Sequence, residues 1–93
     1  MFFLYILFSK GGQRTYVGQT EDLESRLKTH NAGRVKSTLP YVPWKLIHSE
    51  SFRTRAEAMK REKWFKSPRG RKEIAKILMS FQSQIQPERW PSG

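Results

Sequence analysis

The sequence contains no cysteine, which excludes disulfide bonds and metal sites built from thiolates. Long hydrophobic runs are also absent. The most apolar stretch is residues 2–8, whereas a helix that spans a bilayer needs about 20 residues. This stretch has no basic flank before it and no small-residue cleavage site after it, so we interpret it as a buried strand. Without a targeting segment, we expect a cytoplasmic protein that does not enter a membrane.

Acidic residues are scarce as well. Eight Asp and Glu stand against 18 Lys and Arg, which gives a formal net charge of +10 and a pI near 10.4. Such an excess costs a small protein stability through self-repulsion, so it commonly indicates a polyanionic partner. Nucleic acid is the first candidate and an anionic membrane surface the second, while a role in solubility alone needs no partner.

The rest of the composition is that of a small globular protein. With 37% hydrophobic and 13% aromatic residues in 93, the chain supports a single domain with one modest core. We place this domain at residues 1–82. The polar, proline-containing sequence that follows predicts a loose tail over residues 83–93.

Hydrophobic periodicity and turn signals predict an α+β fold with the order ββαβαα. A glycine-containing turn at residues 9–13 joins the first two strands in a hairpin. The capping box Thr54–Glu57 begins one later helix, and Ser67–Pro68 ends it. The expected strands cover residues 2–8, 14–18 and 43–52, and the helices run from a cap at Thr20 or Asp22 to about 31, from about 55 to 66, and from about 69 to 81.

The hairpin brings Tyr5 and Tyr16 to the same face of the sheet. A turn centred on Lys10 and Gly11 puts them directly opposite, and a turn centred on Gly11 and Gly12 makes them diagonal neighbours. Aromatic residues on a central strand usually belong to the core. A phenol that is packed along its ring and free at its tip can also orient a water molecule or accept its proton, and nearby cations lower its pKa toward that task.

Alternation along the third strand places Trp44 and Leu46 on one face and Lys45 and Ile47 on the other. If the alternation continues, His48 lies on the face of Trp44. We interpret Trp44 as a core residue rather than a platform for base stacking. His48 has no partner at a useful spacing and is interpreted as an ordinary strand residue.

Glu62 is the most informative acidic residue. Ala58, Met59 and Phe65 lie three or four positions away in the same expected helix, which places Glu62 in the middle of an apolar stripe. A carboxylate that faces a core is costly unless a cation pairs with it. An ion pair with a neighbouring arginine is the simpler explanation. The other is a hard divalent cation, Mg²⁺ or Mn²⁺, with phosphate and water as further ligands.

Arg26 and His30 are one helical turn apart, beside the apolar residues Leu23 and Leu27. We therefore expect the pair at the border between core and solvent. On a protein this basic, it can be an ordinary surface pair. A guanidinium also binds two oxygens of a phosphate, and an imidazole moves protons near neutral pH, so the pair suits the cleavage of a phosphodiester.

Many of the other basic residues follow the third strand and could form a groove that tracks a phosphate backbone. Some of them must be solvated surface instead. The candidates for contacting nucleic acid are Arg34, Lys36, Arg53, Lys60, Arg61, Lys63, Lys66 and Arg69.

Taken in order along the chain, these residues resemble the pattern of the GIY-YIG nuclease superfamily, and in particular its small single-domain bacterial members. The likeness covers about residues 2–80. Any one element is weak, but the ordered set is specific: Tyr5-Ile6, Tyr16-Val17-Gly18, Arg26, His30-Asn31, Gly33, Pro43-Trp44 and Glu62.

The resemblance implies a three-stranded antiparallel sheet flanked by helices, and hydrolysis of phosphodiester bonds in DNA with a single divalent ion, Mg²⁺ or Mn²⁺. Glu62 corresponds to the metal ligand and Arg26 to the residue that stabilises the phosphate. Tyr5 and Tyr16 correspond to the residues that position or deprotonate the attacking water, and His30 corresponds to a residue that assists them.

Gly18, by the same resemblance, lets the backbone pass close to the site.

The sequence departs from the family pattern at Leu4, where the name-giving glycine is expected, and at Gln19, where several active nucleases carry a lysine. An appended DNA-recognition domain is also missing from the pattern. We therefore expect structure-selective or weakly specific cleavage, with target choice supplied by a partner protein.

Two other functions stay open. The first is a module that binds DNA or RNA and keeps the fold without useful catalysis, which Gln19 and the bare domain favour. The second is a small ribosome-associated or RNA-processing protein whose basic surface binds RNA.

Overall fold

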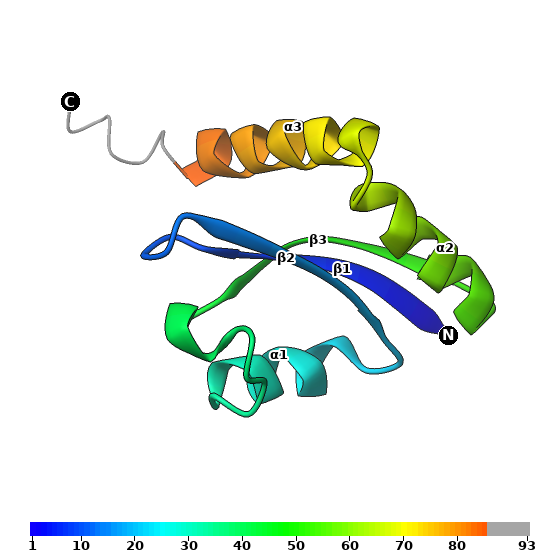
Figure 1. Cartoon of the computed structure of the whole chain (residues 1–93), viewed down its shortest axis with the longest axis horizontal. Helices are drawn as coiled ribbons and strands as arrows, with labels where there is room; N and C mark the ends of the chain where they lie inside the picture. The colour runs from blue at the N-terminus through cyan, green and yellow to red at the C-terminus, as the bar shows by residue number, and fades with distance from the viewer. Residues whose placement is uncertain (86–93) are drawn as a thin grey trace.

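The computed structural model describes residues 1–85 of the chain. Its elements follow the expected order ββαβαα, with one short 3₁₀ helix, η1, added before the third strand (Figure 1). The strands are β1 (Phe2–Ser9), β2 (Arg14–Thr20) and β3 (Lys45–Phe52). The helices are α1 (Leu23–Asn31), η1 (Leu39–Tyr41), α2 (Arg55–Phe65) and α3 (Pro68–Ile85).

The strands form one antiparallel sheet in the order β2-β1-β3, which confirms the α+β class and the three-stranded sheet. β1 lies in the centre, and it is buried from Leu4 to Ser9. It is covered on both faces, because α1 packs on one side of the sheet and α2 and α3 pack on the other (Figure 1). A strand that is apolar without alternation suits such double coverage.

The hairpin adopts the second of the two registers that the sequence allowed. Its turn is centred on residues 11–12, so Tyr5 lies opposite Gly18 and Tyr16 lies opposite Leu7. The two tyrosines are therefore diagonal neighbours on the face covered by α1. As a result, the residue directly opposite Tyr5 carries no side chain.

A bulge interrupts the alternation of β3. The register shifts between Ile6 and Leu7 of β1, and Ile47 is the extra residue on β3. His48 pairs with Ile6 and so lies on the face covered by α2 and α3. The expectation that His48 shares a face with Trp44 is wrong, because the bulge inserts one residue between them.

Local signals set the ends of the helices. Asp22 caps α1 by accepting a backbone hydrogen bond, and Gly33 follows α1 with a positive φ of 75°. Both hydrogen bonds of the predicted capping box are present at the start of α2. α3 extends over residues 83–85, where the sequence predicted a loose tail, because glutamine and serine there do not break a helix. The rest of that predicted tail, residues 86–93, lies outside the described residues.

Two cores lie on the two faces of the sheet. Under α2 and α3 the core contains Leu4 and Phe65, and under α1 it contains Tyr5, Leu7 and Trp44. The buried residues of the second core include two aromatic side chains with polar atoms, Tyr5 and Trp44, whereas those of the first core are apolar throughout. Among residues 1–85, no helix has the length and apolarity that a bilayer crossing needs.

Candidate active site

The side chains of Tyr5, Arg26 and His30 meet on the face of the sheet that α1 covers. Nε of Arg26 donates a hydrogen bond to the Tyr5 hydroxyl at 3.3 Å, and this hydroxyl lies 3.0 Å from Nε2 of His30. Tyr5 comes from the central strand, and α1 presents Arg26 and His30 one turn apart. His30 has no exposed surface, so it lies inside the core and not at the border where the sequence placed it.

A chain of hydrogen bonds fixes the proton on His30. Its Nδ1 lies 2.9 Å from the hydroxyl of Thr38, which donates its only proton to the carbonyl of Val35 at 3.2 Å. Nδ1 must then carry a hydrogen and donate it to Thr38, which leaves Nε2 as an acceptor. The Tyr5 hydroxyl consequently donates its proton to Nε2 of His30.

The surroundings also set the charges of this group. Burial raises the pKa of Tyr5 above its ordinary value, more than the hydrogen bond from Arg26 lowers it. Burial and the positive charge of Arg26 lower the pKa of His30 below 6.5. The hydrogen bond with Tyr5 raises the pKa of Arg26. At neutral pH the phenol and the imidazole are therefore neutral and the guanidinium is charged, so the expectation of a tyrosine pKa lowered by cations is wrong for Tyr5.

Tyr16 completes the aromatic group. Its ring centroid lies 4.9 Å from that of His30 and 6.2 Å from that of Tyr5. Gly18 makes this packing feasible, since a Cβ at that position would lie 2.6 Å from the Tyr5 hydroxyl oxygen and 3.1 Å from the Tyr16 ring. The glycine thus brings the backbone of β2 against the hydroxyl of Tyr5.

Asn31 ties the end of α1 to the start of β3. Its Oδ1 accepts a hydrogen bond from the backbone N–H of Trp44 at 2.6 Å, and its Nδ2 donates to the Trp44 carbonyl at 3.1 Å. The Trp44 indole in turn donates to the backbone carbonyl of Thr38 at 2.9 Å. These bonds hold Thr38 against His30. The sequence did not reveal the role of Thr38, because residues 34–42 carry no periodic pattern.

Glu62 lies at the border of the buried stripe of α2, not in its middle. Ala58 and Phe65 are buried, but Met59 is 52% exposed, so the stripe does not extend to the Met59 side. The Glu62 side chain is 24% exposed, and its Oε2 accepts a hydrogen bond from Nζ of Lys66 at 2.8 Å. The ion pair that was the simpler explanation exists, with a lysine in place of the expected arginine.

Glu62 is still close to the tyrosine group. Its charge contributes to the raised pKa of Tyr5, which puts the carboxylate within electrostatic reach of the phenol. Residues 1–85 contain no cluster of three or more His, Cys, Asp or Glu side chains that could hold a metal ion. A divalent ion held by the Glu62 carboxylate would therefore need phosphate and water oxygens to complete its ligands. This donor set suits Mg²⁺, and Lys66 already provides a positive charge beside the carboxylate.

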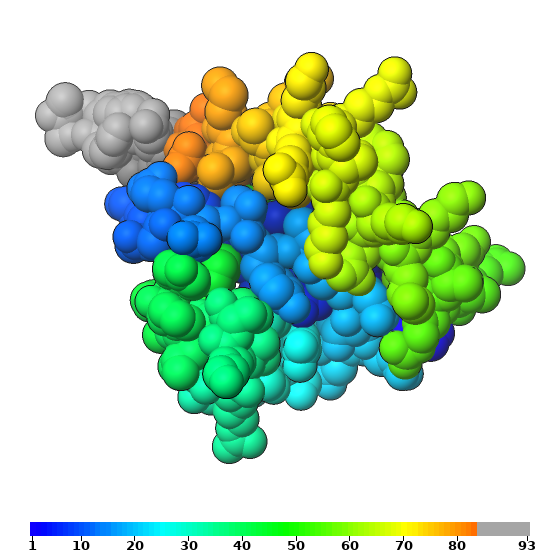
Figure 2. Space-filling view, viewed as in Figure 1, coloured from blue at the N-terminus to red at the C-terminus, as the bar shows by residue number. Residues whose placement is uncertain are grey.

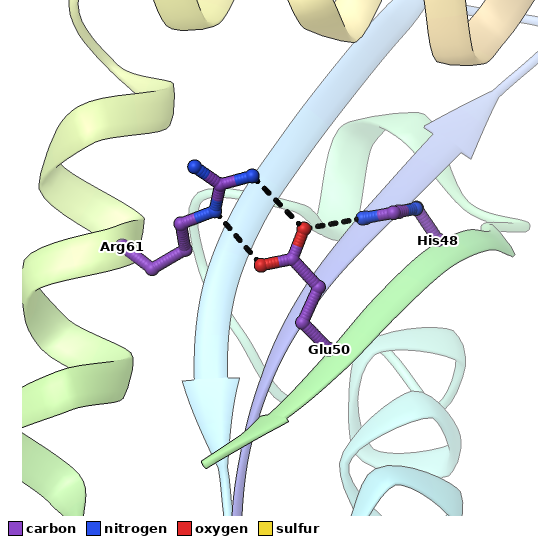
Figure 3. A network of polar contacts seen from close by, with 3 residues as sticks. All are labelled: His48, Glu50 and Arg61. Carbon is purple, nitrogen blue, oxygen red and sulfur yellow. Dashed lines mark hydrogen bonds and ion pairs between the residues drawn. The ribbon is translucent and has the colours of Figure 1, made fainter.

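A second polar network lies on the opposite face of the sheet (Figure 3). The Glu50 carboxylate accepts hydrogen bonds from Nε and Nη2 of Arg61 at 2.8 and 3.2 Å, and it lies 2.8 Å from Nε2 of His48. Burial raises the pKa of Glu50, but the bonds from Arg61 and His48 outweigh it and bring the pKa below its ordinary value. His48 therefore has a partner after all. The signal that the sequence interpretation missed is the spacing of two residues, which puts both side chains on one face of a strand.

The candidates for contacting nucleic acid are exposed, with one exception. Arg61 is half-buried, pairs with Glu50 and lies over the ring of Trp64 at 4.4 Å from its centroid. Its guanidinium serves the fold, which argues against the expected contact with nucleic acid. Three of the others, Lys60, Lys63 and Arg69, belong to α2 and the start of α3, which form the right-hand part of the face in Figure 2. The exposed candidates are Arg34, Lys36, Arg53, Lys60, Lys63, Lys66 and Arg69.

The family model of the GIY-YIG catalytic domain matches residues 1–75, which is most of the chain. The chain belongs to the GIY-YIG family. Every residue of the tyrosine group described above lies within the part that matches the GIY-YIG model, and Glu62 does as well.

UPF0213 proteins are similar to this GIY-YIG chain. A UPF0213 protein of Bacillus velezensis is 46% identical over 65 residues, which cover 69% of this chain and 65% of that protein, a little under two thirds of its length. The UPF0213 protein YazA of Bacillus subtilis is 43% identical over 74 residues, which cover 77% of this chain and 74% of that protein. These names state no activity, substrate or metal.

A solved structure is similar to this GIY-YIG chain over almost its whole length. It is the solution NMR structure of a UPF0213 protein from Bacillus halodurans, with a TM-score of 0.53 and 27% sequence identity. The match covers 92% of this chain and 98% of the other. It supports a GIY-YIG fold for the described residues.

Proposed function

We propose that the protein is an endonuclease that hydrolyses phosphodiester bonds in DNA with one divalent ion, Mg²⁺ or Mn²⁺. Membership of the GIY-YIG family supports nuclease activity, and the net charge of +10 supports a nucleic-acid substrate. The observation that carries the proposal is the phenol of Tyr5, which is held between Arg26 and a neutral His30 within reach of the Glu62 charge.

The hydrogen bond from Tyr5 to His30 offers a path for the proton of the attacking water. As the water oxygen bonds to phosphorus, the bond from phosphorus to the leaving oxygen of the nucleic acid breaks, and that oxygen departs and takes a proton from solvent. In the same step the water proton passes to the Tyr5 oxygen while the Tyr5 proton moves to Nε2 of His30. This transfer needs a neutral imidazole, which the lowered pKa of His30 favours at neutral pH. Tyr5 then acts as a relay and does not have to ionise first, which its raised pKa disfavours.

Arg26 and Glu62 would compensate the negative charge of the phosphate, the first directly and the second through a bound cation. The Nε group of Arg26 is bound to Tyr5, and the two terminal nitrogens of a guanidinium are those that grip two phosphate oxygens. Glu62 would hold the divalent ion, which when bound supplies positive charge beside a phosphate oxygen. Lys66, the present partner of Glu62, would give up that contact.

The proposal also covers the specificity of cleavage, the partner and the location of the protein. The basic surface would recognise the phosphate backbone, and contacts to phosphate carry no information on base sequence, so cleavage would be structure-selective or weakly specific. A partner protein would supply a defined target. We place the protein in the cytoplasm and favour DNA over RNA as its substrate.

Cleavage assays with two variants test the proposal. Branched, nicked and single-stranded DNA are incubated with Mn²⁺ or Mg²⁺ and the wild type, Glu62→Gln or Arg26→Ala. We expect both variants to lose cleavage by about a hundredfold or more, the size of effect seen when a charge-stabilising group is removed. The exposed residues of α1 offer matched controls, Glu24→Gln and Lys28→Ala, which should cut as the wild type does. Absence of cleavage over the whole panel, or equal cleavage by Glu62→Gln, contradicts the proposal.

A binding module without catalysis is the second candidate. Two observations favour it: Lys66 already satisfies Glu62, and residues 1–85 hold no cluster of three metal-binding side chains. It predicts salt-sensitive binding of nucleic acid that neither EDTA nor Glu62→Gln changes, together with no cutting. The same assays therefore separate the two candidates.

A further inference from the structure

An open hollow lies between the edge strand β2 and the segment where α2 meets α3 (Figure 2). Its volume is about 550 Å³, within the range of small-ligand sites. Val17, Phe65 and Ile74, which belong to the buried core, form its apolar floor. Lys66 and Arg71, which are exposed, bring positive charge to its rim.

Two residues connect the hollow to the proposed site of cleavage. Tyr16 lines the hollow and also packs against His30 and Tyr5. Lys66 lines the hollow and also binds the Glu62 carboxylate. The hollow lies on the face of the sheet that α2 and α3 cover, so a molecule in it contacts Tyr16 and Lys66 and is separated from Tyr5 and His30 by the edge of β2.

The chemistry of the walls identifies the kind of occupant. An apolar floor favours a flat, weakly polar ring, and two cations at the rim favour an anion attached to that ring. A nucleotide combines both, whereas a simple anion does not need the floor and an apolar ligand does not need the rim. We propose that the hollow binds a nucleotide near the cleaved phosphodiester, with its base on Val17 and Ile74 and its phosphate on Lys66 and Arg71.

The proposal rests on the nuclease function above and defines its substrate more closely. A base can reach the apolar floor only when it is outside the stack of a double helix, and taking a paired base out of the stack costs a few kcal/mol. DNA with an unpaired nucleotide beside the cut, such as a flap, a nick with a frayed end or a single strand, avoids this cost. The hollow thus selects unpaired nucleotides, and this selection needs no base-specific hydrogen bond.

NMR titration without metal tests the nucleotide site. Thymidine 5′-monophosphate and inorganic phosphate are added separately to the wild-type protein. We expect the nucleotide to shift the methyl resonances of Val17 and Ile74, and inorganic phosphate to leave them in place. Methyl resonances that do not respond to the nucleotide, or that respond equally to inorganic phosphate, overturn the proposal.

Arg71→Ala gives the second measurement, with Lys72→Ala as the matched control. Both residues are exposed on α3, but only Arg71 lines the hollow. Binding of a labelled oligothymidine in EDTA should weaken by about threefold to tenfold for Arg71→Ala relative to Lys72→Ala. Equal affinity of the two variants counts against the site.

The outcome is separable from that of the nuclease proposal. If Glu62-dependent cleavage is found while the methyl resonances do not move, the nucleotide site is wrong and the nuclease stands. If the methyl resonances respond but no substrate is cut, the hollow is a nucleotide-binding site and the nuclease is wrong.

Discussion

His30 can accept a proton at Nε2 because Thr38 occupies its other ring nitrogen. The Thr38 hydroxyl donates its hydrogen bond to the carbonyl of Val35, so it can only accept a hydrogen bond from Nδ1 of His30. A residue from an irregular loop therefore decides which way the hydrogen bond between Tyr5 and His30 runs. Such indirect control is common where a buried imidazole has to keep one tautomer.

Replacing Thr38 with valine should remove this control while keeping the shape of the side chain. The buried Nδ1–H loses its acceptor, so we expect the free energy of unfolding to fall by about 1–3 kcal/mol and cleavage to slow. Thr29→Val is the matched control, because the Thr29 hydroxyl bonds only within its own helix, to Ser25 at 2.9 Å. Urea unfolding of both variants measures the difference. Equal stability of the two would contradict the role of Thr38.

His30 also makes stability depend on pH. Burial lowers its pKa in the folded protein, so the unfolded chain takes up a proton at a higher pH than the folded chain does. The contribution of His30 to the free energy of unfolding is therefore complete above pH 6.5. It is lost as the pH falls through 6.5 toward the lower pKa of the folded state. Glu50 acts in the same direction only below about pH 4.5, which keeps the two windows apart.

Urea unfolding at several values between pH 7.5 and pH 5, on the order of half a unit apart, measures this loss. His30→Gln should have a flatter profile across that window, since the titrating group is gone. Thr29→Val, on the same helix and at a residue that does not titrate, is the matched control and should keep the slope of the wild type. A wild-type profile that is already flat, or that rises toward pH 5, contradicts a lowered pKa for His30.

Sequence reasoning at the residue scale identified the members of the group but not how they are held. The spacing of Arg26 and His30 and the shared face of the two tyrosines follow from periodicity alone. The position of Glu62 did not, because counting neighbours along a helix does not show where the apolar stripe ends. Met59 was counted as part of the stripe, yet it is 52% exposed.

β2 carries a glycine where any side chain would meet the tyrosines. A Cβ at position 18 would lie 2.6 Å from the Tyr5 oxygen and 2.8 Å from Cζ of the same ring. Gly18→Ala should therefore push the phenol away from His30, at a cost of about 1–3 kcal/mol in the free energy of unfolding and with a loss of cleavage. Gly11→Ala, where no atom lies within 4 Å, is the matched control and should change stability by less than about 0.5 kcal/mol. Equal behaviour of the two variants would show that the ring has room to move.

The elements themselves were largely predictable, because their signals are local. Glycines mark the hairpin, a capping box marks the start of α2, and an apolar strand without alternation marks the centre of the sheet. The bulge at Ile47 was not predictable, since it depends on how β3 meets β1 and not on the residues of β3 alone. It has a chemical consequence: it places His48 and Glu50 together on the face covered by α2 and α3, away from the tyrosine face.

At the scale of the whole molecule, the sheet separates two groups of polar side chains: the network around Glu50 on one face and the tyrosine group on the other. Arg61 and Glu62 are neighbours on α2, but they lie on opposite borders of its buried stripe. Arg61 reaches Glu50 on β3 (Figure 3), and Glu62 lies within electrostatic reach of Tyr5. One helix thus serves both the fold and the proposed site, and the net charge of +10 has to be divided between cations that support the structure and cations that meet nucleic acid.

The dependence of binding on salt distinguishes these two kinds of cation. For the wild type in EDTA, the logarithm of the binding constant for duplex DNA should fall linearly with the logarithm of salt concentration, with a slope of about −0.9 for each phosphate contact. Lys60→Ala should make the slope shallower by about that amount and leave the free energy of unfolding unchanged, because Lys60 is exposed.

Arg61→Ala, at the next position, should do the reverse. The slope should stay as it is, while the free energy of unfolding falls by about 1 kcal/mol because Glu50 loses its partner in a part-exposed ion pair. Fluorescence anisotropy and urea unfolding of the two variants give both quantities. If Arg61→Ala flattens the salt dependence as much as Lys60→Ala does, Arg61 contacts phosphate, and the division of the basic residues between fold and binding surface is wrong.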